Sequence, residues 1–265
     1  MFCISCGKEL PPKAKFCPNC GTPVFAYDSA NDSKDEDKRK NASTGLENGH
    51  EWVDLGLSVK WATCNIGAAR SEDHGSPFAW GEVSPKDSGR WIGYRFLRNL
   101  PRDFIDPLTI DLFSARTKKQ EYRMLDQIEE MESCISSHLT KYNELDGITQ
   151  LDISDDAARV NWGGRWRMPS ESDFGELRSR CLWTWTNLGG INGYSVSGPN
   201  GNSIFLPASA PNMRGGIVYW VSDRDDSNLR NAKGFIIPDS PEVEFRKFAT
   251  CRCFPQPIRP VLVGF

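Results

Sequence analysis

The chain has 265 residues, of which 25 % are charged and 11 % are aromatic, and its formal net charge is −3. This length allows one large domain, or a small domain followed by a medium one. The near balance of charge excludes a wholesale basic face for nucleic acid, and no apolar run is long enough to cross a bilayer. Because the first residues lack the basic head and apolar stretch of a secretory signal, we expect a cytoplasmic protein without a membrane partner.

Two Cys-x2-Cys pairs, each followed by glycine, stand within the first 24 residues. Two residues between thiolates allow a tight turn that aims both sulfurs at one Zn²⁺ ion, and the glycine supplies the backbone freedom that the turn needs. A unit this small has almost no core, so metal binding would supply its folding free energy. The sequence therefore predicts a zinc ribbon over residues 1–25, with one structural Zn²⁺ held by Cys3, Cys6, Cys17 and Cys20.

The other five cysteines are scattered along the chain, and we expect free thiols at these positions in a reducing compartment, although export would permit disulfides. They are Cys64, Cys134, Cys181, Cys251 and Cys253. Redox chemistry is the alternative to zinc at the first four cysteines, but no thioredoxin-like βαβ pattern surrounds them.

Residues 26–50 contain no Val, Ile, Phe or Trp, and their charge runs acidic and then basic. Such a segment cannot bury enough apolar area to offset the entropy of ordering it, so it is predicted to be a flexible linker. From residue 51 to residue 265 the composition becomes globular, dense in tryptophan and glycine.

The globular part alternates short apolar stretches with turn residues, which predicts strands and an α+β fold rather than a parallel βαβ fold. Two helices are predicted, one over residues 117–137, where apolar residues recur at spacings of three and four, and one over residues 171–181. Ser170 is a good N-cap for the second helix. The predicted strands are residues 52–57, 59–63, 194–197, 203–206, 218–222, 234–237 and 258–263.

Several tryptophan-rich phrases follow one another through this part of the chain. They include EWVDLGLSVKWATCN at 51–65, FAWGE at 78–82, NWGGRWRMP at 161–169, YW at 219–220 and IRPV at 258–261. Together they resemble the Fibrobacter succinogenes major paralogous domain, which is abundant in gut Bacteroidales, over nearly all of residues 51–263. The resemblance implies a C-type-lectin-like fold.

Large side chains in these phrases are expected to form the core of the globular part. The tryptophans expected there are Trp61, Trp80, Trp162 and Trp166. Arg167 and Arg259 are expected to be structural ion-pair partners rather than ligand contacts.

Residues 221–257 depart from the pattern of that family, and in lectin-like folds this part of the chain lies at the exposed ligand face. Mixed aromatic and arginine side chains are typical of recognition surfaces, although drift in surface loops would also produce them. The residues that we expect to bind a ligand are Arg224, Asp226, Asn228, Arg230, Phe245, Arg246 and Phe254.

No catalytic constellation is apparent, since the three histidines do not occur in a triad or metal-hydrolase spacing. The leading interpretation is therefore a non-enzymatic module that binds a protein or a small ligand. A sharper version makes the chain the variable protein of a diversity-generating retroelement. The alternative is a divergent relative of the formylglycine-generating enzymes, an oxidoreductase family whose cysteine pair invites comparison with Cys251 and Cys253 but is spaced differently.

A third hypothesis is that the zinc ribbon contacts nucleic acid through Lys8, Lys13 and Lys15. Affinity for nucleic acid scales with the number of phosphates that are neutralised, so three lysines make only a weak patch. We therefore expect no nucleic-acid partner.

Overall fold

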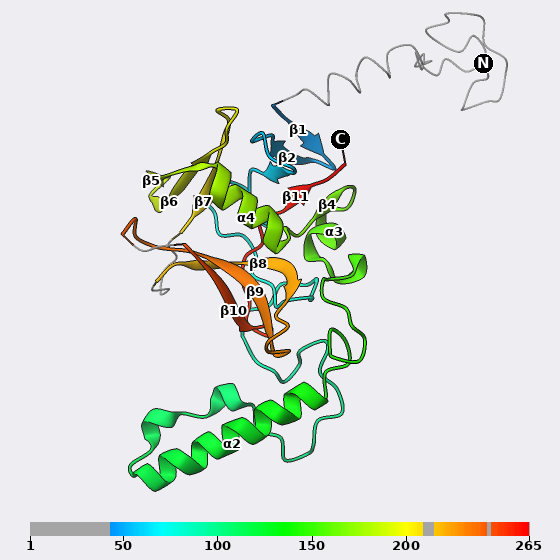
Figure 1. The fold of residues 1–265 in the computed structure, drawn as a ribbon, viewed down its shortest axis with the longest axis vertical. Helices are drawn as coiled ribbons and strands as arrows, with labels where there is room; N and C mark the ends of the chain where they lie inside the picture. The colour runs from blue at the N-terminus through cyan, green and yellow to red at the C-terminus, as the bar shows by residue number, and fades with distance from the viewer. Residues whose placement is uncertain (1–42, 209–214, 243–244, 265) are drawn as a thin grey trace, which may run out of the picture. The chain divides into compact units, whose positions relative to one another are not determined.

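The computed structural model describes residues 43–208, 215–242 and 245–264 (Figure 1). The chain divides into two compact units, Met1–Ala42 and Ser43–Phe265. The first unit, with the predicted zinc ligands and most of the predicted linker, lies outside the described residues. The second unit combines helices with antiparallel sheets, so the expectation of an α+β fold is confirmed.

One five-stranded sheet joins segments from both ends of the second unit, in the order β1-β2-β3-β11-β4. Its strands are β1 (Thr44–Glu47), β2 (His50–Val53), β3 (Lys60–Ala62), β4 (Trp166–Arg167) and β11 (Val261–Leu262). All of its neighbouring strands are antiparallel, and β11 lies between β3 and β4, pairing Val261 with both Trp61 and Arg167.

The hairpin between β1 and β2 corrects the predicted extent of the linker. Asn48 and Gly49 form its two-residue turn, and both have positive φ, 48° and 80°. An Asn-Gly pair is the preferred sequence for a turn of this handedness, because asparagine and glycine tolerate left-handed backbone best. The linker prediction of residues 26–50 is therefore wrong at its end, since folded structure begins by Thr44.

Two three-stranded antiparallel sheets complete the strands, ordered β5-β6-β7 and β10-β9-β8. Their strands are β5 (Leu182–Leu188), β6 (Ile191–Ser197), β7 (Ser203–Pro207), β8 (Ile217–Arg224), β9 (Asn231–Ile237) and β10 (Arg246–Cys251). Strands β5 and β10, each at one edge of its sheet, were absent from the sequence prediction, whereas the other four strands were expected.

The two predicted helices are present, as α2 (Lys118–Ser137) and α4 (Glu171–Arg180). Ser170 caps α4 by accepting a hydrogen bond from the Asp173 amide, while the Asp173 carboxylate accepts one from the Ser170 amide, which is a complete capping box. The sequence missed the short helix α3 (Ala157–Trp162). Three 3-10 turns are η1 (Pro107–Thr109), η2 (Leu112–Ser114) and η3 (Ile153–Asp155).

The core confirms the expected role of the tryptophans, since Trp61, Trp80 and Trp166 are fully buried and Trp162 is 9 % exposed. Trp61 meets Phe174 of α4 edge to face, with 5.0 Å between ring centres, and so joins the five-stranded sheet to the helix. This is a favoured aromatic geometry that adds to the free energy gained by burying both rings.

Of the two arginines expected to form ion pairs, one does. Arg167 donates to the Asp173 carboxylate at 2.7 Å. Arg259 is fully buried but donates instead to Asn65 Oδ1 at 2.7 Å and to backbone carbonyls, including that of Ala62 at 3.1 Å. The expectation of an ion pair was wrong for Arg259, because carbonyl dipoles and one amide take the place of a carboxylate.

Candidate functional site

Residues 221–257, which we expected to form an exposed recognition face, are in large part interior. Val221, Ala232, Phe235, Ile237 and Cys253 are all at most 3 % exposed. Residues 219–222 of β8 are all buried, so both faces of this strand are covered, because side chains alternate across a strand. The expectation of a continuous exposed loop region was therefore wrong, and any binding surface is confined to the outer strand and to turns.

Four of the seven predicted ligand-binding residues lie in or beside the β8–β9 connection, where they contact the protein itself. Arg224 is buried; it donates to the Asn143 carbonyl at 2.6 Å and pairs with Asp226 at 2.9 Å. Arg230 donates to Asn228 Oδ1 at 3.2 Å and pairs with Glu132 of α2. These side chains bind the β8–β9 connection to neighbouring segments of the chain, so their role is structural.

The other three predicted residues do not join that group. Phe245 packs on Trp183 and Tyr194, with ring centres 4.4 and 4.9 Å apart, and so belongs to the edge of the core. Phe254 lies so close to Gly89 that a Cβ on that glycine would collide with its ring. Arg246 is exposed.

The register of β10 separates Arg246 from the group at the β8–β9 connection. Arg246 lies opposite Ile236, whereas Cys251 lies opposite Asn231 beside that connection. Five residues of strand span about 17 Å, so the seven predicted residues do not form one site.

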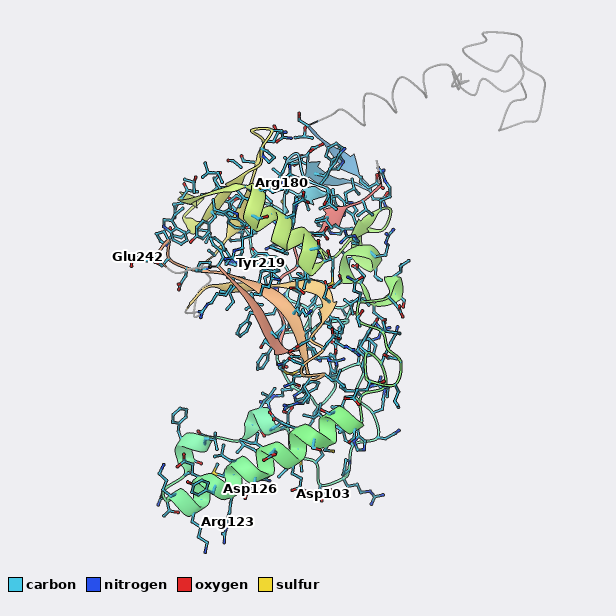
Figure 2. All side chains as sticks on the ribbon, in the orientation of Figure 1. Asp103, Arg123, Asp126, Arg180, Tyr219 and Glu242 are labelled. Carbon is cyan, nitrogen blue, oxygen red and sulfur yellow. A yellow bond between two sulfur atoms is a disulfide. The ribbon has the colours of Figure 1, made fainter. Side chains whose placement is uncertain are left out.

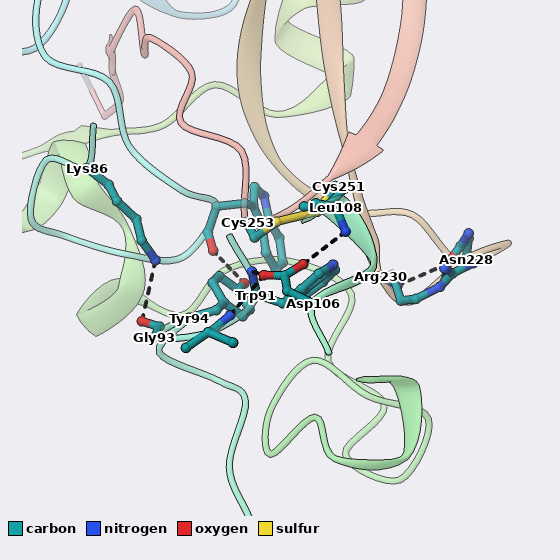
Figure 3. Close-up of a disulfide and its surroundings, with 12 residues drawn as sticks. Lys86, Trp91, Gly93, Tyr94, Asp106, Leu108, Asn228, Arg230, Cys251 and Cys253 are labelled. Carbon is teal, nitrogen blue, oxygen red and sulfur yellow. Dashed lines mark hydrogen bonds between the residues drawn. A yellow bond between two sulfur atoms is a disulfide. The ribbon is translucent and has the colours of Figure 1, made fainter. Parts of the chain in front are cut away.

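A disulfide closes the other end of β10 (Figure 3), between Cys251 and Cys253. The expectation of free thiols was wrong for this pair, while Cys64, Cys134 and Cys181 are free. Residues 252–253 form a turn at the end of β10, which brings the two Cα atoms to 5.4 Å, within the usual range for a disulfide.

Arg252, between the two half-cystines, is fully buried and lies with its guanidinium 5.5 Å from the centre of the Trp80 ring. It donates to the carbonyls of Tyr142, at 3.1 Å, and of Leu229. Burial lowers the pKa of its guanidinium, since no carboxylate among the described residues forms an ion pair with it. This cluster holds the end of the β8–β10 sheet against residues 141–142.

The outer strand β10 is the most open part of the predicted face. Its first four residues, 246–249, are all exposed, so both faces of the strand meet solvent there. Phe248 leaves 39 % of its surface uncovered. Within the described part of the chain β10 pairs only with β9, so its other edge carries backbone groups without a strand partner.

A hollow of about 580 Å³ lies between α4 and β10. Its lining residues are Glu171, Ser172, Gly175, Glu176, Ser179, Asp223 and Lys247. Gly175 stands in the middle of α4, and a Cβ there would meet nothing within 4 Å, so the missing side chain opens the hollow. A glycine inside a helix costs about 1 kcal/mol relative to alanine, so its presence in the predicted helix is the signal in the sequence that indicates such an opening.

Glu171, the first residue of α4, links this helix to the β8–β10 sheet. Its carboxylate accepts hydrogen bonds from Lys247 of β10 at 2.6 Å and from Lys233 of β9 at 3.0 Å. These bonds hold the pKa of Glu171 below its usual value, so the carboxylate stays ionised. Glu176 and Asp223 also line the hollow, and Glu176 pairs with Arg180 at 2.7 Å, so cations of the protein itself already lie beside these carboxylates and the hollow is of mixed charge.

Comparison with known proteins identifies one module. Residues 2–24 match a zinc-ribbon domain family, and this stretch contains all four cysteines predicted to bind zinc, Cys3, Cys6, Cys17 and Cys20. No curated protein and no solved structure matches the chain significantly. In the part of the chain that the structure describes, no helix has both the length and the apolar character that crossing a membrane requires.

Proposed function

We propose that residues 43–264 form a non-enzymatic binding module that takes up an extended segment of a partner protein along β10. The observation that carries this proposal is the combination of an unpaired strand edge with four consecutive exposed residues and an adjoining hollow lined by polar residues. A strand added to a sheet edge gains main-chain hydrogen bonds, while pockets for alternate side chains provide selectivity.

The chemistry of the surface defines the segment that would fit. A strand beside β10 would direct every second side chain toward α4, where the charged groups of Glu171, Asp223 and Lys247 offer hydrogen-bond partners to polar side chains. On the other face, Phe248 offers an apolar contact for the residues in between. The expected ligand is therefore a short extended peptide in which polar and apolar residues alternate.

Selection of random linear peptides against the full chain, followed by calorimetric titration, tests the proposal. Phe248→Asp should weaken binding of a selected peptide at least about tenfold, because an exposed aromatic anchor is lost. Leu182→Asp on the edge strand β5 is the matched control, since Leu182 is 69 % exposed, and it should bind as the parent protein does. Peptides that bind both variants equally well would show that β10 is not the site.

For the N-terminal unit, we propose one structural Zn²⁺ held by Cys3, Cys6, Cys17 and Cys20. The family match over residues 2–24 supports a zinc ribbon, and four thiolates are a donor set that tetrahedral zinc prefers. Bound zinc would supply folding free energy to that unit.

We also propose that the second unit belongs to the Fibrobacter succinogenes major paralogous domain and has a C-type-lectin-like fold. The tryptophan-rich phrases that carry the resemblance form the interior, with Trp61, Trp80 and Trp166 fully buried. If the chain is the variable protein of a retroelement, burial restricts tolerated variation to positions such as 246–249. A neighbouring reverse-transcriptase gene, with a near-copy of this coding segment that differs at adenines, would test that role.

An oxidoreductase remains the alternative, and the disulfide between Cys251 and Cys253 is the observation that favours it. Cys253 is fully buried, so only Cys251 is open to an external reductant. Copper(I) titration of the reduced protein tests this alternative, because an enzyme of that class should bind copper through these thiols. Binding that survives replacement of both cysteines by serine would argue against it.

A further inference from the structure

Helix α2, together with η1 and η2, forms an arm that lies apart from the three sheets (Figure 1). Only one face of α2 is covered, and Ile135 is its single buried residue. Tyr122 and Leu125 remain 66 % and 42 % exposed. Lys118, Tyr122, Leu125 and Glu129 follow one another at spacings of four, three and four, and therefore form one exposed stripe along the helix.

The charges of α2 are unevenly distributed along the helix. Residues 118–123 carry Lys118, Lys119 and Arg123 against Glu121 alone, whereas residues 126–132 carry Asp126, Glu129, Glu130 and Glu132. Figure 2 labels Arg123 and Asp126, which lie on this arm where the first stretch gives way to the second. A net positive start and an acidic continuation oppose the helix dipole, which favours acidic residues at the N-terminus and basic ones at the C-terminus.

Side-chain pairs within α2 do not offset this unfavourable interaction of its charges with the helix dipole. Lys119 and Arg123 are like charges four residues apart, and so are Asp126 and Glu130, which destabilises an isolated helix. The ion pairs of α2 are Lys118 with Glu121, at 2.9 Å, and Glu132 with Arg230. Across the described residues, no ion-pair partner is found for Lys119, Arg123, Asp126, Glu129 or Glu130.

We propose that this arm is a self-association surface, through which two copies of the chain pair with their α2 helices antiparallel. In a two-fold pairing centred between Arg123 and Met124, Tyr122 of each copy meets Leu125 of the other, and Lys118 meets Glu129. On the flank of the same stripe, Lys119 lies two residues out of register with Glu130, and Arg123 two residues out of register with Asp126, a shift of about 3 Å that their long side chains can span. The helix is thus complementary to itself, as a two-fold interface requires.

The size of the surface indicates a weak dimer. A 20-residue helix is about 30 Å long and about 10 Å wide, so one exposed face offers less than the roughly 800 Å² per partner of a stable complex. Since most of its contacts pair exposed charges, the dimer should weaken steeply as salt screens them.

A charge-exchange experiment on the full chain, read by sedimentation velocity, tests the proposal. At low salt the parent protein should dimerise reversibly with concentration, and each of two double variants, Lys118→Glu with Lys119→Glu and Glu129→Lys with Glu130→Lys, should associate at least about tenfold more weakly. An equal mixture of the two variants should recover the parent affinity. In a mixed dimer the glutamates introduced at 118 and 119 of one chain face the lysines introduced at 129 and 130 of the other chain, and the remaining native residues at these positions also pair with opposite charges.

Recovery in the mixture separates the proposal from misfolding, since two misfolded chains would not restore a dimer. The first variant also places acidic residues at the start of α2, which the helix dipole favours, so helical content by circular dichroism should not fall. A parent protein that stays monomeric at every concentration would overturn the proposal. So would variants that dimerise unchanged, or a mixture that fails to associate.

Discussion

Replacing Asp173 with alanine should destabilise the second unit by about 3 kcal/mol, the lower end of the cost of breaking a buried ion pair. Asp173 is 7 % exposed, and its Oδ2 accepts hydrogen bonds from Arg167 Nη1 and the Ser170 amide at 2.7 Å and from Ser170 Oγ at 2.8 Å. Arg167 is 28 % exposed, so water can partly replace the lost carboxylate, which is why the lower figure applies.

Urea unfolding of the full chain, followed by tryptophan fluorescence, measures this cost. All nine tryptophans lie at residue 52 or later, so the signal reports on the second unit alone. A double-mutant cycle with Arg167→Met should give a coupling free energy of about 1.5–3 kcal/mol between the two side chains. A loss below 1 kcal/mol for the alanine variant, or a coupling near zero, would refute the reasoning.

The same side chain predicts a dependence on pH. Burial alone raises the pKa of Asp173, but the hydrogen bonds from Arg167 and Ser170 outweigh it and hold the pKa below the usual 3.8. The folded state therefore binds this proton less readily than the unfolded chain, and the carboxylate stabilises the fold above pH 3.8. The stability difference between the parent protein and Asp173→Asn should be constant at neutral pH and shrink as the pH falls below 3.8.

Three further predictions concern the zinc, the linker and the core. Metal analysis should find one zinc per chain, lost when Cys17 and Cys20 become serine; unchanged zinc content would contradict the ligand assignment. Limited proteolysis should cut first between residues 26 and 42 and release a fragment that begins near Ser43; earlier cleavage at 100–150 would count against this. Trp166→Ala should cost about 3–5 kcal/mol, whereas Arg246→Ala should stay within about 0.5 kcal/mol; similar losses would mean that β10 is part of the core.

Elements with a strong local signal could be predicted from the sequence. The periodic apolar residues of 117–137 gave α2 almost to the residue, and Ser170 with Asp173 marked the start of α4. The edge strand β10 was missed because its exposed residues, 246–249, show no alternation of apolar and polar side chains. An open edge strand lacks the pattern because neither face is buried there.

The ligand-binding residues could not be predicted in the same way, because composition does not reveal which arginines are buried. Arg246 is exposed, whereas Arg224 and Arg252 are buried within the same segment and bind backbone carbonyls contributed by residues 141–143 and 229. The carbonyls of residues 142 and 143 come from a part of the chain that lies 110 and 81 residues away from these arginines, so only the fold shows the difference.

The position of β11 has a consequence for the synthesis of this protein. Because β11 joins β3 to β4 and pairs Val261 with Trp61, 200 residues earlier (261 − 61), the five-stranded sheet cannot close before residue 262 has left the ribosome. Until then the edge of β3 that β11 will occupy is open on the nascent chain. Such long-range pairing slows folding and prolongs the exposure of unpaired strand edges, so the second unit should depend on chaperones during translation more than a helical protein of equal length.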